Sequence, residues 1–360
     1  MRRAFGLILL ALGVFAVAGA VLLPAYVYPK LAKVPLDQDS TSTLEGTASQ
    51  VLAVTDNGSG PVSAIRKDAK LTAVAHVQAN FAAPEMHQDT DYAVWLLAVQ
   101  VTDDADNTVL SASKRQVCFD RRSGEGYEPR GETDPKCDAK SSYVTELKDK
   151  ADKDGQKPPE TNDYKPQPGL NFKFPFGTEQ QDYKVYDDNT GAAVTARFAG
   201  TETVDGIETY KFVQDIPDTK IATKDVPGSL VGSPDPTVQA DLYYRGVNTL
   251  WVEPVTGIEM KQQQQQHQEL RAGTSGTSAV VFDGTLAYTA ETVAKMADQV
   301  NANKGRLEFL SSTGPLWLGI GGGVLIIGSI VLLARRRRPE PPAAPRGKQP
   351  PRKVLFTAGP

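Results

Sequence analysis

The chain has 360 residues, of which 40% are hydrophobic and 23% charged, so it can bury a packed core and is not a wholly disordered protein. Its formal net charge of −4 is unevenly distributed. When Arg2, Arg3 and residues 335–360 are left out, 29 basic and 42 acidic side chains remain, a net charge of −13. This acidic main part argues against nucleic-acid binding.

Residues 4–27 form an uncharged run that can cross a bilayer core as a helix, which needs about 20 residues. Two arginines precede the run. The small residues at 18–20 also fit the cleavage site of a signal peptide. Because the apolar run continues beyond Ala20, we favour an uncleaved membrane anchor over a signal peptide.

Strand-like runs, rich in β-branched and aromatic residues, dominate the next part of the chain, residues 28–313. Three runs end in an acidic residue, two variable residues, a hydroxyl residue and a glycine. These motifs lie at 120–124, 187–191 and 253–257. A glycine can adopt positive φ after a type I turn, so each motif predicts a hairpin turn. We favour this interpretation over an active site built from the acidic residues. We expect helices at 141–155 and 290–312.

The sequence contains two cysteines, Cys118 and Cys137, and both fall in this middle part. In an oxidising compartment they are expected to form one disulfide. The three histidines are separated in sequence from each other and from the cysteines, so we expect no metal site.

A distinctive segment, GLNFKFPF at 169–176, alternates large apolar residues with Asn171, Lys173 and Pro175, which is typical of a strand with one apolar face. The apolar residues are Leu170, Phe172, Phe174 and Phe176. Such a face most often packs in a core. The alternative is that these residues line an apolar cavity for acyl chains.

A run of five glutamines follows the turn at 253–257, and we predict that it is an ordered strand. Its alternate residues share a face with Ile258 and Met260. The glutamines on this face include Gln262, Gln264 and Gln266. Because buried amides need partners, the face meets solvent, a neighbouring amide ladder or the polar section of a ligand channel. We favour a solvated sheet face.

A second uncharged run, residues 314–334, is also long enough to span a membrane. Arg335, Arg336, Arg337 and Arg338 follow it. Under the positive-inside rule both termini lie in the cytoplasm and the middle part lies outside. The four arginines are expected to bind anionic lipid heads, and the Pro-rich tail is expected to be disordered.

The predicted fold class is α+β, with an antiparallel β-rich domain outside the cytoplasm between two transmembrane helices. The predicted parts are a cytoplasmic N-terminus (1–3), helix one (4–27), the β-rich domain (28–313), helix two (314–334) and a basic tail (335–360). The sequence contains no Gly-rich phosphate loop, zinc spacing or nucleophile elbow. We therefore predict a protein that is not an enzyme and has no cofactor.

Several segments between the two anchors together resemble a known family. They are LPAYVYPKLAKVPLD, QVCFDRRSGEG, KPQPGLNFKFPFGTEQQDYKVYDDNTG, FAGTETVDGIETYKFVQDIP and LYYRGVNTLWVEPVTGIEMKQQQQQ. The chain resembles the actinobacterial two-helix envelope family of unknown function, which includes PorA-type porins and the lipomannan-carrier-like protein LmcA. The resemblance implies a plasma-membrane protein whose external domain is similar to class B scavenger receptors, which enclose a lipid tunnel.

The leading functional hypothesis is a non-catalytic protein that binds or carries membrane lipid or lipoglycan at the outer face of the plasma membrane. One alternative is a scaffold or sensor for envelope assembly. A second alternative is an oligomeric porin. Two apolar helices cannot form a membrane β-barrel, so a pore would need several copies.

Overall fold

The computed structural model describes residues 2–56, 61–88, 91–131, 136–146, 161–272 and 277–334. The chain divides into a larger unit, Leu23–Gly314, and a smaller unit built from Met1–Leu22 and the segment that begins at Pro315. Arg335–338, predicted to meet anionic lipid heads, lie outside the described residues.

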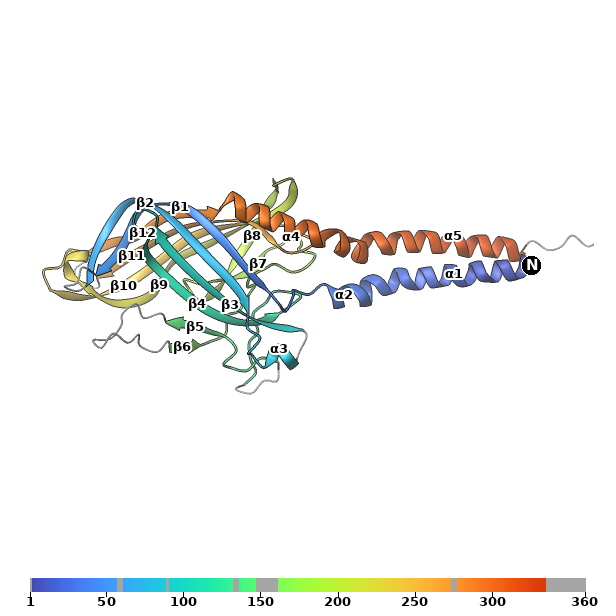
Figure 1. Ribbon diagram of the computed structural model, residues 1–360, viewed down its shortest axis with the longest axis horizontal. Coiled ribbons are helices and arrows are strands. Elements are labelled where there is room, and N and C mark those ends of the chain that lie inside the picture. The colour runs from blue at the N-terminus through green and yellow to red at the C-terminus, as the bar shows by residue number, and fades with distance from the viewer. Residues whose placement is uncertain are drawn as a thin grey trace, which may run out of the picture. The chain divides into compact units, whose positions relative to one another are not determined.

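Within the described residues of the larger unit, twelve strands form one antiparallel sheet that is strongly curled (Figure 1). The strands are β1 (Asp39–Asp56), β2 (Pro61–Ala79), β3 (Tyr92–Asp103), β4 (Thr108–Asp120), β5 (Tyr143–Glu146), β6 (Thr161–Tyr164), β7 (Tyr183–Asp187), β8 (Ala192–Val204), β9 (Ile207–Pro227), β10 (Thr237–Val252), β11 (Glu259–Ala272) and β12 (Ser278–Tyr288). Their order is β6-β5-β4-β3-β2-β1-β12-β11-β10-β9-β8-β7. Two six-strand meanders therefore join where the first strand pairs with the last.

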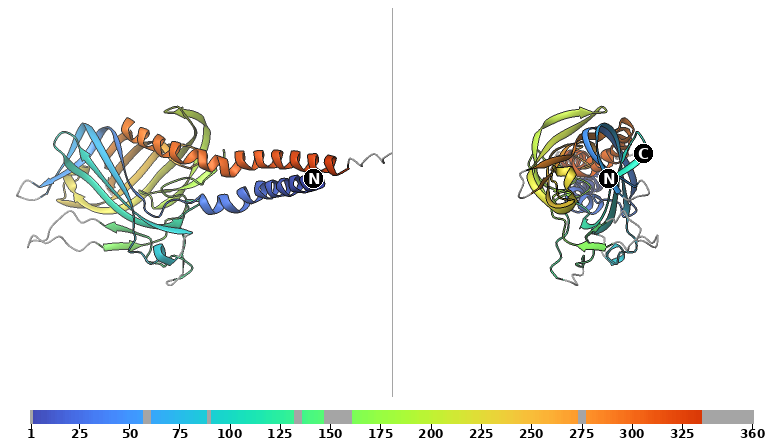
Figure 2. Two further views of the ribbon diagram at one scale, coloured as in Figure 1. Left: turned by 45° about the vertical axis from the view of Figure 1, so that its right-hand side comes forward. Right: turned by 90° about the vertical axis from the view of Figure 1, so that its left-hand side faces the viewer.

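Short helical segments and one longer helix accompany the sheet (Figure 2). They are η1 (Leu23–Val27), α2 (Tyr28–Leu31), α3 (Glu85–Gln88), η2 (Gly228–Val231), α4 (Ala290–Glu308) and η3 (Phe309–Thr313). α4 confirms the helix expected at 290–312. The side chain of Thr289 caps it by accepting from the peptide nitrogen of Thr292. Ala297 and Val300 of this helix pack with Trp251 and Met260 of β10 and β11.

The three turn motifs are confirmed as hairpin turns. In the β7–β8 turn, one carboxylate oxygen of Asp187 accepts from the peptide nitrogen and the hydroxyl of Thr190, both at 2.8 Å. Gly191 follows with φ 67°. Asp120 and Glu253 hold the other two turns in the same way. These three acids are therefore structural parts of the turns.

The segment 169–178, which we call the clasp, is not the predicted strand. Leu170 makes isolated bridges to both Glu125 and Val185, so the clasp joins the chain beyond β4 to the edge strand β7. Phe172 takes φ 60°, a conformation that no regular strand contains. The apolar residues of this segment therefore alternate in sequence although the segment is a loop, and their side chains do not share one face.

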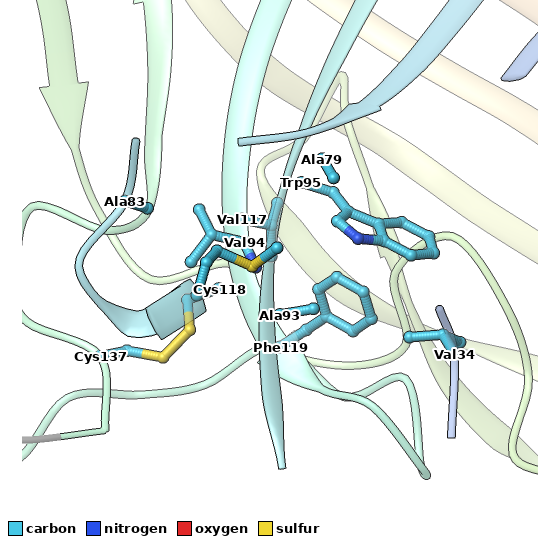
Figure 3. Packing of buried hydrophobic residues seen from close by; sticks show 11 residues of the cluster. Val34, Ala79, Ala83, Ala93, Val94, Trp95, Val117, Cys118, Phe119 and Cys137 are labelled. Atoms are coloured by element: carbon cyan, nitrogen blue, oxygen red, sulfur yellow. A yellow bond between two sulfur atoms is a disulfide. The ribbon is translucent and has the colours of Figure 1, made fainter. Parts of the chain in front are cut away.

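The predicted disulfide between Cys118 and Cys137 is present, with 6.3 Å between the Cα atoms. Both cysteines are buried in one hydrophobic cluster, within which Figure 3 shows the bridge. Trp95 and Phe119 meet edge to face in the same cluster, with ring centroids 4.9 Å apart.

The helix expected at 141–155 is wrong where the structure describes it. Residues 143–146 form strand β5, which pairs with β4 and β6. The remainder of that prediction, residues 147–155, lies outside the described residues. The predicted fold class is nevertheless confirmed: an antiparallel β-rich domain between two terminal helices.

The described part of the smaller unit is α1 (Arg2–Leu22) together with the residues of α5 (Gly314–Ala334) from Pro315 on, and the two helices pack through small residues. A Cβ added to Gly13 would lie 2.9 Å from the carbonyl oxygen of Gly322, and the reverse distance is 2.8 Å. Such small residues let helix backbones approach closely. The helical segments Arg3–Leu31 and Ala290–Ala334 each contain a stretch long and apolar enough to cross a membrane.

Candidate functional site

The larger unit contains a cavity of about 1160 Å³ inside the curled sheet. Most of its lining comes from β1–β4, β7, β9–β12, the clasp and α4. This volume exceeds the roughly 300–1,000 Å³ of most small-molecule pockets. A cavity of this size that is lined by so many strands suits a long ligand better than a compact metabolite.

One side of the cavity is apolar. β2 and β3 present alternate residues to it, and we call these residues the apolar wall. They are Ala73, Ala75, Val77, Leu97, Val99 and Val101. Because alternate residues of a strand point to one face, each of these strands lines the cavity with three apolar side chains in a row. The wall offers a hydrocarbon surface without a buried charge.

Another side is rich in amides. β9, β10 and β11 supply the residues that we call the amide wall. They are Gln214, Asn248, Gln262, Gln264, Gln266 and Gln268. Asn248 donates to the side-chain oxygen of Gln214 at 2.9 Å, and Gln266 donates to that of Gln264 at 2.8 Å. The amides thus partly satisfy one another, and the favoured expectation of a solvated outer sheet face is wrong for these glutamines.

Glu259 joins the amide wall because β11 contains a bulge. Val252 pairs with Glu259 and Trp251 with Lys261, so Met260 is the extra residue. Met260 is fully buried outside the cavity lining, whereas Glu259 lines the cavity. The exposed part of Glu259 faces this interior space, and burial raises the pKa of its carboxyl to about 7. Sequence alternation alone does not predict Glu259 in the cavity, because an unbroken strand would place it on the face opposite to Gln262.

A buried arginine lies where β4 meets the clasp. Arg115 donates from Nη1 to the side-chain oxygens of Gln167 at 2.9 Å and Asn171 at 2.8 Å. Its Nε lies 2.8 Å from a carboxylate oxygen of Asp188. The guanidinium also lies over the ring of Phe172, 5.0 Å from the centroid. Its charge is therefore compensated within the protein.

The residues that the sequence suggested for a ligand cavity separate into two groups. Those that line the cavity are Leu170, Phe172, Phe176, Gln262, Gln264 and Gln266. Phe174 is not among the lining residues: it is fully buried and stacks on Phe212 with 4.8 Å between ring centroids. The expectation that Phe174 lines the cavity is wrong because the clasp turns between Phe172 and Phe174.

The cavity extends over most of the length of the sheet. Lining residues of β1 run from Asp39 to Val54, which corresponds to roughly 50 Å of strand. Leu31 and Leu310 also line it. Leu31 belongs to α2, which η1 connects to α1, and Leu310 belongs to η3, which directly precedes α5. The cavity therefore reaches the residues that connect the sheet to α1 and α5.

Comparison with known proteins gives a family. The model of the Porin PorA family matches residues 5–331. The chain is 25% identical over 305 residues to Porin PorA of Corynebacterium amycolatum, and the aligned part covers 72% of this chain and 75% of that protein. These matches confirm the resemblance to PorA-type proteins and, with the two apolar helices, indicate a membrane or envelope location. The chain belongs to the PorA porin family.

Proposed function

We propose that this protein is a non-catalytic envelope protein that binds or carries an amphiphile, a membrane lipid or lipoglycan, in the cavity of its sheet domain. The observation that carries the proposal is the separation of the cavity lining into an apolar wall and an amide wall. Acyl chains would lie on the apolar wall, because burying hydrocarbon there removes it from water. The polar part of the ligand would hydrogen-bond with the amides.

The proposed topology places residues 28–313 outside the plasma membrane and both termini in the cytoplasm. Arg2 and Arg3 precede the uncharged run 4–27 and four arginines follow α5, a charge distribution typical of cytoplasmic flanks. The disulfide supports the same assignment, since disulfides persist in oxidising compartments. The proposed membrane spans are 4–27 and 314–334.

The ends of the cavity suggest how a ligand could reach it. Leu31 and Leu310 line the cavity within nine residues of α1 and four residues of α5. In the proposed topology these residues lie near the outer bilayer surface. A lipid could then pass between the bilayer and the cavity without a long path through water, which would otherwise expose its acyl chains.

A non-catalytic role is favoured by how the acids of the domain are used. Asp120, Asp187 and Glu253 each accept hydrogen bonds from the turn that follows them. These three carboxylates are therefore committed to turn structure, which leaves them unsuited to general acid–base catalysis.

The second candidate is an oligomeric porin, which the family name favours. A pore would have to form from copies of α1 and α5, whose exposed faces are apolar. The residues buried between the two helices include Gly13, Gly322 and Ser329, which offer close packing but little polar surface for a water-filled lumen.

Two measurements on the purified full-length protein separate the candidates. Native mass spectrometry after gentle detergent extraction should show an amphiphile bound at one per chain, and planar bilayers should show no conductance. If the protein conducts ions and carries no bound amphiphile, the porin function is favoured over the carrier function. The four arginines at 335–338 are proposed to hold anionic lipid heads, and their removal should leave ligand occupancy unchanged.

A further inference from the structure

Lys173 is a buried lysine in the wall of the cavity. Only 6% of the residue is exposed, and its ammonium makes no hydrogen bond with any described residue. The nitrogen lies 3.4 Å from the ring centroid of Phe176, and both residues line the cavity. The aromatic ring is thus the group that covers the charge.

An unpaired buried ammonium is costly, because desolvation is not compensated by a partner. Burial lowers the pKa of Lys173 well below its ordinary value, and the negative charge of Asp120 opposes this effect only in part. Arg115, the other buried cation of this region, has two amide acceptors and Asp188. Lys173 therefore lacks the compensation that the same part of the fold provides to Arg115.

The position of Lys173 is fixed by the clasp. Its peptide nitrogen donates to the carbonyl oxygen of Asn171 at 2.6 Å, directly after the positive φ of Phe172. A Cβ added to Gly124 would lie 3.3 Å from the Cγ atom of Lys173, so the stem of the side chain packs on this turn. Strained backbone of this kind persists when the surrounding structure holds it, and it gathers at ligand sites.

We propose that Lys173 is the receptor for an anionic group, a phosphate or carboxylate, in the cavity. This inference rests on the proposed binding of an amphiphile. The ring of Phe176 covers the ammonium and moves aside when the anion binds, since a charge-assisted hydrogen bond replaces a weaker cation–π contact. Phe172 and Trp95, whose rings lie 5.4 Å apart, extend the same site toward the apolar wall for the attached acyl chain.

The test uses the full-length protein in detergent with Lys173→Met, which keeps the length of the side chain and removes its charge. Vesicles of phosphatidylglycerol and of phosphatidylcholine supply the lipids, and inorganic phosphate is added as a competitor. The matched control is Lys224→Met, because Lys224 also lines the cavity but is exposed. Retained phosphatidylcholine binding shows that each variant is folded.

The native protein should take up phosphatidylglycerol about tenfold better than phosphatidylcholine, and Lys173→Met should abolish this preference. Lys224→Met should retain it. Competition by inorganic phosphate would assign the site to a free anion, and its absence would assign the site to a lipid headgroup. Equal preference in native protein and Lys173→Met would overturn the inference while leaving amphiphile binding intact. Binding of neither lipid would overturn both.

Discussion

The peptide nitrogen of Phe174 donates a 2.9 Å hydrogen bond to the carbonyl oxygen of Gly257. This bond joins the clasp to the turn between β10 and β11. Gly257 has φ 72°, and a Cβ added there would lie 2.1 Å from the carbonyl oxygen of Phe174. The glycine therefore serves two needs at once, the turn conformation and the close approach of the clasp.

The first prediction compares two glycines at positive φ. Gly257→Ala should lower the free energy of unfolding by about 2–5 kcal/mol, because strain and a backbone clash add. Gly206→Ala should cost about 1 kcal/mol, since nothing lies within 4 Å of its added Cβ and only φ 76° is unfavourable. Urea unfolding followed by tryptophan fluorescence measures both. Equal losses would contradict the role of the close approach.

Local chemistry explains which parts of the fold the sequence predicts well. The turn at 187–191 depends on a carboxylate, a hydroxyl and a glycine within five residues, all visible in the sequence. The clasp depends on hydrogen bonds to Gly124, Lys184 and Gly257, which are distant in sequence. An alternation of apolar residues cannot reveal such long-range partners, so residues 169–176 read as a strand.

The second prediction concerns the disulfide between Cys118 and Cys137. Replacing both cysteines by serine should lower the free energy of unfolding by about 3 kcal/mol, because the unfolded chain regains the freedom of a loop of about 20 residues. Figure 3 shows the bridge within the cluster that contains Trp95 and Phe119, so tryptophan fluorescence reports on it. A loss well below 1 kcal/mol would show that the cluster holds this loop without the bridge.

The third prediction is a pH dependence that arises from Glu259. Its folded pKa of about 7 lies above the ordinary value of 4.5, so the folded state keeps a proton that the unfolded state releases between these pH values. Raising the pH from 4.5 to 7 therefore lowers stability, and the full loss is present above pH 7. The free energy of unfolding of Glu259→Gln, relative to that of the native protein, should therefore rise by about 2 kcal/mol when the pH is raised from 5 to 8.

Thermal unfolding at the two pH values measures this gain. Glu45→Gln, on an exposed position of β1, is the matched control and should change stability little at either pH. A gain from Glu259→Gln that is the same at pH 5 and pH 8 would show that this carboxyl is not the titrating group.

The fourth prediction tests the packing of α1 against α5. Gly322→Leu should weaken the helix pair by about 1–3 kcal/mol, because a Cβ there meets the backbone of Gly13. Gly321→Leu is the control, since nothing lies within 4 Å of its added Cβ. With fluorophores on Ala4 and Ala334, energy transfer reports the helix pair in detergent. In Gly322→Leu it should be lost at a lower concentration of denaturing detergent than in the native protein, and in Gly321→Leu at the same concentration. An equal loss of energy transfer in both variants would show that α1 and α5 do not pack through Gly322.

The candidate site shows the limit of reasoning from strand alternation. The sequence places Gln262, Gln264 and Gln266 on one face, and all three line the cavity. It cannot place the bulge at Met260, because a bulge follows from the pairing of β10 with β11 over many residues. Glu259 therefore enters the cavity unexpectedly. The closure of the sheet around a hollow also depends on the clasp, which no single strand reveals.

In the proposed function, the cavity between the apolar wall and the amide wall holds an amphiphile. Neighbouring residues of β2 provide a matched test: Ala75 lines the cavity, whereas Val74 is exposed on the other face. Native mass spectrometry of the full-length protein should show that Ala75→Trp loses the bound amphiphile and that Val74→Trp retains it. An Ala75→Trp protein that is folded and carries as much amphiphile as the native protein would show that the amphiphile does not bind in this cavity.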